Sequence, residues 1–182
     1  MTTHIHGGTT KAMNRKHSGF TLIELMAVLA IAAILASVAV PSFRSMIQNN
    51  RLATQANELT GTLNFARSEA IKRGNSVTVC VSNNQAGCTG GTTWENGWIA
   101  FVDVNRDQSL SAGDTLLRVR STLTGSGTLT GAQTAVQYLP NGLLNFGTGN
   151  YTLTIPGCTG NEKRVINVAV TGRLGVTRAT CP

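Results

Sequence analysis

The distribution of apolar residues divides the chain into three parts, and the first is almost entirely apolar. Residues 20–40 carry a single charged side chain, Glu24. At a helical rise of about 1.5 Å per residue this segment is roughly 31 Å long, close to the thickness of the hydrocarbon core of a bilayer. A carboxylate in such a segment costs roughly 2.5–3.5 kcal/mol on insertion scales, so it normally has a partner or a purpose. We therefore predict a membrane-spanning helix over residues 20–41 in which Glu24 has a function.

Beyond Pro41 the pattern becomes that of an amphipathic helix ending near residue 73. Lys72 and Arg73 suit the negative end of the helix dipole, and Gly74 suits the position just after the last helical residue. Pro41 is expected to kink this long helix rather than to end it. The apolar side chains recur mostly at intervals of three and four and predict a stripe that covers a sheet: Phe43, Ile47, Leu52, Ala56, Leu59, Leu63, Ala66 and Ala70.

After Gly74 the pattern changes to short alternating runs separated by Gly, Asn, Thr and Ser, which is typical of strands. The low-complexity stretch 122–134 is expected to be a mobile loop. A helix followed by antiparallel strands predicts an α+β fold, with residues 42–182 as one domain that includes the amphipathic helix 42–73. The predicted strands are 76–82, 97–102, 115–120, 135–139, 143–146, 151–155 and 164–171.

Charge and composition limit the chemistry and the orientation of the chain. The formal net charge is +7, and three cations without an acid precede residue 20: Lys11, Arg15 and Lys16. Such residues favour a cytoplasmic N-terminus and an exported C-terminal domain. All three histidines also precede residue 20: His4, His6 and His17. A chain that begins at residue 20 would lack histidine, so we expect no enzyme with a catalytic histidine and no cofactor.

The cysteines of the exported part are predicted to form disulfides. They are Cys80, Cys88, Cys158 and Cys181, and no two have the CxxC spacing. Oxidising conditions outside the cytoplasm favour disulfides over a metal site. Four cysteines allow three pairings. We favour Cys80–Cys88 and Cys158–Cys181 because each pair brackets one predicted strand–loop unit, and each bond would constrain the unfolded chain by roughly 3 kcal/mol.

The start of the apolar segment, GFTLIE at residues 19–24, resembles the class III signal of type IV pilins and pseudopilins. In that family prepilin peptidase cuts between Gly and Phe, and the new N-terminus is methylated. The glutamate at the fifth mature position pairs with the N-terminus of a neighbouring subunit. The resemblance implies a leader at residues 1–19, processing at Gly19 and Phe20, and an assembly role for Glu24. A start at Met13 would give a shorter leader, so the origin of residues 1–12 stays open.

Two other interpretations of the segment stay open. The sequence Ser37-Val38-Ala39 fits a signal-peptidase site, and cleavage there would release a soluble protein beginning at Val40. In the other interpretation the segment is a plain single-pass anchor whose Glu24 extends toward the membrane interface. An intact mass corresponding to methylated Phe20 at the N-terminus would favour the pilin, whereas a start at Val40 would exclude it.

The chain beyond the leader resembles the GspH/FimT/FimU group of minor pilins and pseudopilins. The matching stretches are 66–74 (ARSEAIKRG), 77–80, 94–103, 114–118 and 172–173. The resemblance implies a long helix docked on a β-rich head. It also implies an inner-membrane protein with a periplasmic head, which the assembly platform inserts into a filament of major and minor pilins. We expect a FimT/FimU-like minor pilin that primes or caps a surface pilus and supports twitching motility and DNA uptake. The alternative is a GspH-like pseudopilin of type II secretion.

An oxygen-rich stretch at residues 103–114 has the spacing of a calcium-binding EF-hand loop. Its candidate ligands are Asp103, Asn105, Asp107 and Asp114. However, Gln108 stands where the loop needs glycine, Asp114 replaces the bidentate glutamate, and the flanking segments are predicted strands. We therefore favour an Asx-rich turn without a metal ion.

The C-terminal region carries a cluster of cations that is a candidate DNA-binding site. Some FimT proteins of naturally competent bacteria are associated with DNA capture through a C-terminal Gly-Arg-x-Arg element. Here Gly172 and Arg173 match, but Gly175 replaces the second arginine. Binding to phosphates would be salt-sensitive and independent of sequence, and the alternative is a charged strand edge that aids solubility. The cations are Lys163, Arg164, Arg173 and Arg178.

Overall fold

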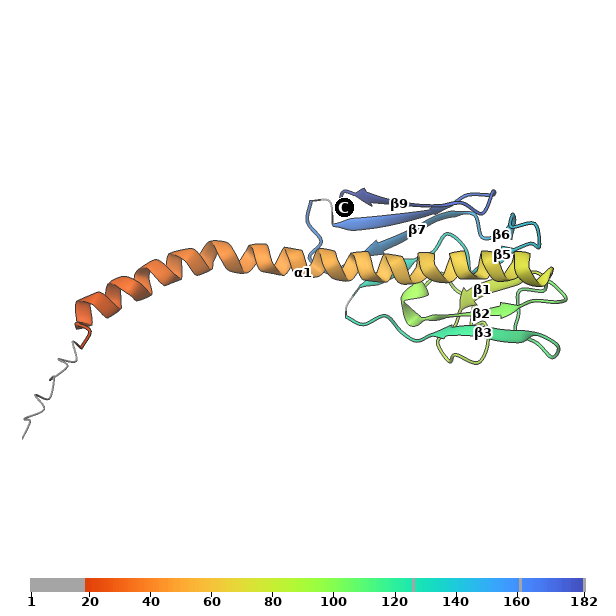
Figure 1. Ribbon diagram of the computed structural model, residues 1–182, viewed down its shortest axis with the longest axis horizontal. Helices are drawn as coiled ribbons and strands as arrows, with labels where there is room; N and C mark the ends of the chain where they lie inside the picture. The colour runs from red at the N-terminus through yellow and green to blue at the C-terminus, as the bar shows by residue number, and fades with distance from the viewer. Residues whose placement is uncertain (1–18, 126, 161, 182) are drawn as a thin grey trace, which may run out of the picture. The chain divides into compact units, whose positions relative to one another are not determined.

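The computed structural model describes residues 19–125, 127–160 and 162–181 (Figure 1). Within them a long helix, α1 (Leu22–Arg73), precedes the strands, and a 3-10 helix, η1 (Trp94–Asn96), lies between β1 and β2. The predicted α+β fold is confirmed. The leader expected at residues 1–19 lies outside the described residues except for Gly19. The strands are β1 (Val77–Val81), β2 (Trp98–Val102), β3 (Thr115–Arg120), β4 (Thr128–Thr130), β5 (Ala135–Tyr138), β6 (Leu144–Phe146), β7 (Gly149–Thr154), β8 (Lys163–Val168) and β9 (Leu174–Ala179).

Both ends of α1 have a local chemical cause. At the start, the hydroxyl oxygen of Thr21 accepts a hydrogen bond from the backbone N–H of Glu24 (3.3 Å), which is an N-cap contact. At the end, Gly74 adopts a φ of 65° and its N–H donates to the carbonyl of Ala70 (3.1 Å). The helix continues through Pro41, whose missing N–H removes one backbone hydrogen bond. The predicted end of the helix and its glycine cap are both confirmed.

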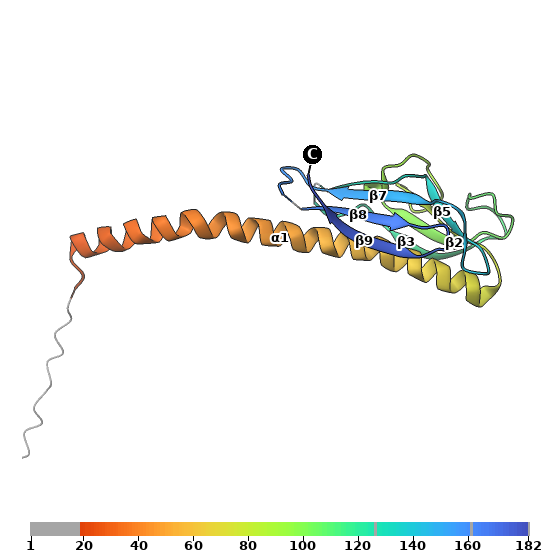
Figure 2. The same ribbon diagram turned by 90° about the horizontal axis from the view of Figure 1, so that it is seen from above.

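The chain forms two units, Met1–Ser42 and Phe43–Pro182, and α1 contributes one part to each. We call the second unit the head. Its strands form a five-stranded sheet in the order β3-β2-β1-β5-β6 and a four-stranded sheet in the order β4-β7-β8-β9. All strand pairs are antiparallel, as predicted. Figure 1 shows β1, β2 and β3 on one side of the second part of α1 and β7 and β9 on the other, and Figure 2 shows β7, β8 and β9 side by side.

One hydrophobic core joins α1 to both sheets. It contains Leu59 and Leu63 from α1, Trp98 from the larger sheet, and Tyr151 and Ile166 from the smaller one. The indole N–H of Trp98 donates to the Thr62 hydroxyl at 3.2 Å, so the helix also satisfies a buried polar group of the sheet. The buried apolar stripe begins at Leu52. The expectation that Phe43 and Ile47 belong to it is wrong, because both side chains are exposed in the head.

Two strands were missed in the sequence. The stretch 122–134, expected to be a loop, contains β4, whose residues alternate exposed, buried and exposed around Leu129. The last strand, β9, pairs with β8 from Leu174 to Ala179 and forms an edge of the smaller sheet. Both segments are short and rich in Thr or Gly, and only their pairing with β7 and β8 identifies them as strands.

The structure contains both disulfides that the sequence favoured. Cys80 in β1 is bonded to Cys88 in the following loop, with the Cα atoms 5.6 Å apart. Cys158, between β7 and β8, is bonded to Cys181 after β9, with the Cα atoms 5.8 Å apart. The second bond fastens the C-terminal strand to the β7–β8 connection, and the Cys181 N–H reinforces it by donating to the Gly160 carbonyl at 2.9 Å.

Candidate membrane and assembly surface

The first part of α1 presents apolar side chains on all of its faces. The exposed fractions of its large apolar residues run from 48% at Val40 to 83% at Phe20, which lies just before the helix. By length and composition α1 is the one helix among the described residues that can cross a membrane. A helix that is apolar all round must be covered by lipid or by other protein, because exposing its apolar surface to water is unfavourable.

The residues expected to be processed lie just outside this helix. Gly19 and Phe20 are exposed and precede the first helical residue, Leu22. A β-carbon on Gly19 would contact nothing within 4 Å, so its lack of a side chain has no packing cause in the described chain. The peptide bond between Gly19 and Phe20 is therefore accessible, and packing within the described chain does not require glycine at position 19.

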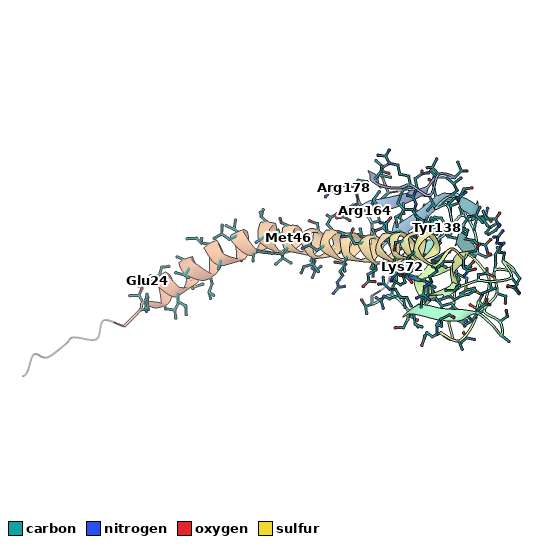
Figure 3. All side chains as sticks on the ribbon, turned by 45° about the vertical axis from the view of Figure 1, so that its right-hand side comes forward. Glu24, Met46, Lys72, Tyr138, Arg164 and Arg178 are labelled. Atoms are coloured by element: carbon teal, nitrogen blue, oxygen red, sulfur yellow. A yellow bond between two sulfur atoms is a disulfide. The ribbon has the colours of Figure 1, made fainter. Side chains whose placement is uncertain are left out.

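Glu24 lies in the first turn of α1, near the start of the helix in Figure 3. A carboxylate there interacts favourably with the positive end of the helix dipole. Among the described residues, no basic side chain forms an ion pair with it. By contrast, the other two glutamates of α1 have partners: Glu58 accepts from Arg120, and Glu69 from Arg73. Glu24 is thus the one glutamate of α1 that has no ion pair among the described residues.

The head attaches its sheets to α1 through arginines that sequence analysis did not single out. Arg67 of α1 donates from Nη1 to the Gly172 carbonyl and from Nη2 to the Thr171 carbonyl, both at 3.2 Å. In the opposite direction, the guanidinium of Arg118 in β3 lies 4.3 Å from the ring centroid of Phe65. Arg67 lies within the 66–74 stretch, but sequence spacing could not show which turn it would reach.

The calcium candidate Asp103 is a buried structural residue. Its Oδ2 accepts hydrogen bonds from the Thr78 hydroxyl (2.7 Å), the Gln137 amide nitrogen (2.7 Å) and the Gln108 N–H (3.0 Å). Its Oδ1 accepts from the Asp107 N–H at 3.2 Å. These donors replace the hydration of the carboxylate, so Asp103 links β1, β5 and the 103–114 loop inside the head.

The other candidate ligands also form hydrogen bonds within the loop. Asp114 accepts from the N–H groups of Val104 (3.0 Å) and Ser111 (2.9 Å). Partial burial opposes ionisation, but these bonds hold the pKa of Asp114 below its usual value. Asn105 donates to Asp107 at 2.7 Å. The bonds are those of an Asx-rich turn, and the described residues contain no group of three or more His, Cys, Asp or Glu that could hold a metal ion.

The four C-terminal cations do not form one surface. Arg164 is only 4% exposed, and its Nη2 donates to the Asn49 side chain of α1 at 3.0 Å. Arg178 lies opposite Arg164 in the β8–β9 pair, and Figure 3 shows both arginines on the same side of the head. Lys163 is paired with Ala179 instead. Arg173 lies at the other end of β9, five strand residues from Arg178 or roughly 17 Å away. The proposed DNA-contact role of Arg164 is therefore wrong for this conformation, because the side chain is buried against α1.

Burial and a like charge act together on Arg164. Desolvation lowers the pKa of its guanidinium, Arg178 on the neighbouring strand lowers it further, and Glu162 raises it. A guanidinium stays charged despite such shifts. Arg164 is thus a buried cation whose hydrogen bond with Asn49 fastens β8 to α1.

Comparison with known proteins decides the family. Residues 55–172 match the model of a family described as type II transport protein GspH. The chain belongs to the GspH family. Residues 14–40 also match the prokaryotic N-terminal methylation motif. Together the two matches confirm the resemblance to the GspH/FimT/FimU group, a family of structural pilin and pseudopilin subunits. The methylation motif and the apolar first part of α1 indicate a membrane-anchored protein of this family.

Curated relatives and solved structures agree with this assignment. The chain is 32% identical over 88 residues to a type IV major fimbrial protein FimA of Dichelobacter nodosus, covering 46% of this chain and 54% of FimA. A second FimA of that organism is 30% identical over 104 residues, covering 57% and 64%. The chain thus spans less than two thirds of the length of either relative.

The type IV minor pilin FimU of Pseudomonas aeruginosa shares the fold in two crystal forms. The TM-scores are 0.54 and 0.53, with 20% and 21% identity. The similarity covers 70% of this chain and 89% of FimU in one form, and 69% and 91% in the other. At this level of identity the comparison establishes the pilin-like fold of the GspH-family head.

Proposed function

We propose that this protein is a minor pilin of a type IV pilus. It is made as an inner-membrane precursor with a cytoplasmic N-terminus and a periplasmic head, and prepilin peptidase cuts it between Gly19 and Phe20. An assembly platform then moves it into a filament with major and minor pilins, where it primes or caps assembly. The observation that supports this proposal is the apolar, exposed first part of α1 joined to a head with a closed core of its own.

The physical basis is that one apolar surface can serve in two environments. In the bilayer, lipid covers the first part of α1. In a filament, the helices of neighbouring subunits replace the lipid, and the apolar surface stays out of water throughout. Head-to-tail contacts that do not close into a ring extend such a filament indefinitely.

Glu24 would select the correct neighbour during this transfer. Processing would create a cationic α-amino group on Phe20, and Glu24 has no ion-pair partner among the described residues. A carboxylate in an apolar surrounding is costly unless it is paired. Pairing Glu24 with the N-terminus of an adjacent subunit would remove that cost only in the correct register, so the contact would align the subunits.

Processing can be tested directly on the precursor. Gly19→Val should block cleavage and leave a membrane-held precursor, because a peptidase subsite shaped for glycine rejects a larger side chain. Gly61→Val is the matched control, since Gly61 is exposed on α1 and a β-carbon there meets nothing within 4 Å. Intact mass should show an N-terminal Phe20 with one added methyl group in the control. Normal cleavage of Gly19→Val, or a wild-type chain beginning at Val40, would contradict the proposed processing.

A GspH-like pseudopilin of the type II secretion system is the second candidate, supported by the description of the matching family. Deleting the gene in its host separates the two functions. Loss of surface pili, twitching or DNA uptake with continued secretion of exoproteins would support the pilus. Loss of secretion with intact pili would assign the chain to the secretion system, with the same anchor and the same head.

A further inference from the structure

Three exposed aliphatic residues lie on the segments where the end of α1 meets two β-turns. They are Ile71 (54% exposed), Leu143 (44%) and Val170 (66%). Ile71 lies against the first turn, since a β-carbon on Gly142 would be 2.9 Å from its Cδ1. The second turn is joined to the first by a hydrogen bond from the Leu144 N–H to the Val170 carbonyl (3.0 Å). We call Ile71, Leu143 and Val170 the turn patch.

The first turn of this patch is rigid by its own hydrogen bonds. The N–H of Gly142 donates to the Leu139 carbonyl, and the N–H of Leu139 donates to the Leu143 carbonyl, both at 2.8 Å. Gly142 has a φ of 78°, a conformation that a glycine adopts without strain.

The second turn is closed in the same way and is fastened to α1. Gly172 donates to the Ala169 carbonyl at 2.8 Å, and Ala169 donates to the Arg173 carbonyl at 3.0 Å. Arg67 holds the turn from the helix through the Thr171 and Gly172 carbonyls. A β-carbon on Gly172 would overlap the Gly142 carbonyl oxygen, so the two turns are in direct contact. The patch is therefore preformed, and a partner would have little ordering to impose on it.

The rim of the patch is positively charged. Lys72 follows Ile71 on α1, Arg73 comes next, and exposed Arg173 follows Gly172 in the second turn. The one carboxylate nearby on α1, Glu69, is largely buried and is bound to Arg73 and Lys72. The Arg73 guanidinium holds the pKa of Glu69 below its usual value, against the opposing effect of burial, so this carboxylate stays ionised. Its single negative charge offsets only one of the three cations.

We propose that the turn patch is a docking surface for the head of another pilin subunit, one that presents aliphatic side chains within a rim of Asp and Glu. An apolar centre excludes water, and a charged rim selects the partner and its orientation. The inference rests on the proposed function, because it requires a filament in which subunits meet. DNA fits this surface less well, because aliphatic side chains occupy its centre. A protein surface that binds nucleic acid would present cations or stacking aromatic side chains there.

Site-specific photo-crosslinking of the full chain in its host tests this surface. A photoreactive phenylalanine analogue replaces Ile71, Leu143 or Val170, one at a time. The control positions are Val104 and Val119, which are exposed apolar residues on other parts of the head. Patch positions should cross-link to another protein carrying the N-terminal methylation motif, with a yield about tenfold above the controls. Each variant must resist protease as well as the wild type does, since this resistance shows that its head is folded.

Charge reversal then tests the rim. In the Val170 cross-linking background, Arg173→Glu should lower the yield about tenfold, because it places a like charge against the acidic partner. Arg178→Glu is the matched control, since it makes the same change of charge on an exposed residue at the other end of β9. This control should retain the wild-type yield.

Each outcome supports or overturns a defined statement. Equal yields at patch and control positions, or equal losses for the two charge reversals, would overturn the docking surface. Cross-links from the patch to DNA would overturn it in favour of nucleic-acid binding. If the wild-type chain enters sheared filaments but the patch positions do not cross-link, the docking surface fails and the proposed function stands. If processed wild-type chain never enters filaments, both fail.

Discussion

The two parts of α1 share one helical conformation but differ in how their apolar surface is covered. In the first part, apolar side chains surround the helix and stay exposed. In the second part they form a stripe from Leu52 to Ala70 that is buried against two sheets of the same chain. The number of apolar residues does not distinguish these situations. Their arrangement around the helix does, because a stripe can be covered by one folded head whereas a full apolar surround requires lipid or other subunits.

The charged residues show the same difference. In the head, the Glu58 carboxylate is 2.8 Å from Nη2 of Arg120 and Glu69 is bound to Arg73, so both helical glutamates are satisfied within the chain. Glu24 has no ion pair among the described residues. The head thus buries the apolar stripe of α1 and pairs both glutamates of that part of the helix within the chain, while the first part of α1 leaves its apolar surface and Glu24 to its surroundings. The following predictions test this contrast in order of decreasing effect.

The largest effect is expected from the unpaired glutamate. Glu24→Ala should insert into the membrane at least as well as wild type, because it removes a carboxylate that costs roughly 2.5–3.5 kcal/mol in an apolar segment. Its incorporation into sheared filaments should nevertheless fall about tenfold or more, since loss of a buried pairing leaves the partner cation unpaired. Quantitative immunoblots of membrane and filament fractions measure both. Glu58→Ala, which removes a partly buried ion pair in the head, should assemble normally, and equal incorporation of all three chains would refute the pairing role.

Truncating one leucine in each part of α1 should separate stability from anchoring. Leu59 is fully buried in the core and Leu29 is exposed. Leu59→Ala should lower the free energy of unfolding of the head by about 2–5 kcal/mol, because it leaves a cavity, and Leu29→Ala should leave it unchanged. Denaturation of the full chain in detergent micelles can be followed by tryptophan fluorescence, since Trp94 and Trp98 are both buried in the head. A similar loss in both variants would show that the first part of α1 also stabilises the head.

The closed core should also make the head sensitive to alkali. Tyr138 and Tyr151 are the only tyrosines of the chain, and both are buried. Burial raises the pKa of Tyr138 to about 12, although Arg67 opposes the shift. Burial, together with Tyr138, also raises the pKa of Tyr151. Their contribution to stability is complete below the ordinary pKa of 10.0 and is lost as the pH rises toward 12.

Tyrosinate absorbance and tryptophan fluorescence should therefore change together in an alkaline titration of the full chain. A folded head keeps the tyrosines neutral, so tyrosinate should form as the head unfolds. A rise in tyrosinate absorbance near pH 10.0 with unchanged fluorescence would mean that water reaches the rings in the folded head. Tyrosinate from the unfolded chain in denaturant provides the reference curve.

The smallest effect compares the two tyrosine hydroxyls. The hydroxyl of Tyr151 donates to the Gly147 carbonyl at 2.9 Å, whereas the buried hydroxyl of Tyr138 has no hydrogen-bond partner among the described residues. Tyr151→Phe should cost about 1 kcal/mol of unfolding free energy, and Tyr138→Phe should be neutral or slightly stabilising. Denaturant midpoints of the two variants measure the difference. Equal losses would mean that Tyr138 has a partner in solution, such as a buried water.

Local patterns in the sequence determined the features that depend on neighbouring residues. The apolar run at 20–40, the three- and four-residue spacing that follows it, and Gly74 together predicted α1 and its end. Alternation predicted seven of the nine strands in the described residues with errors of a few residues, and bracketing of strand–loop units predicted both disulfides. GFTLIE indicated the family, and residues 14–40, which contain it, match the N-terminal methylation motif.

Only the tertiary structure decided the features that depend on contacts between residues far apart in the chain. Arg164 was expected to be a solvated cation, but the β8–β9 register and the packing of β8 on α1 bury it beside Asn49. β4 is identified by its pairing with β7, and Phe43 is exposed although the helical spacing placed it on the apolar stripe. The turn patch unites residues 71, 143 and 170, which share no local pattern. The spacing of apolar residues in the sequence shows which side of a helix or strand is apolar. Strand register and packing between distant segments decide what covers that side.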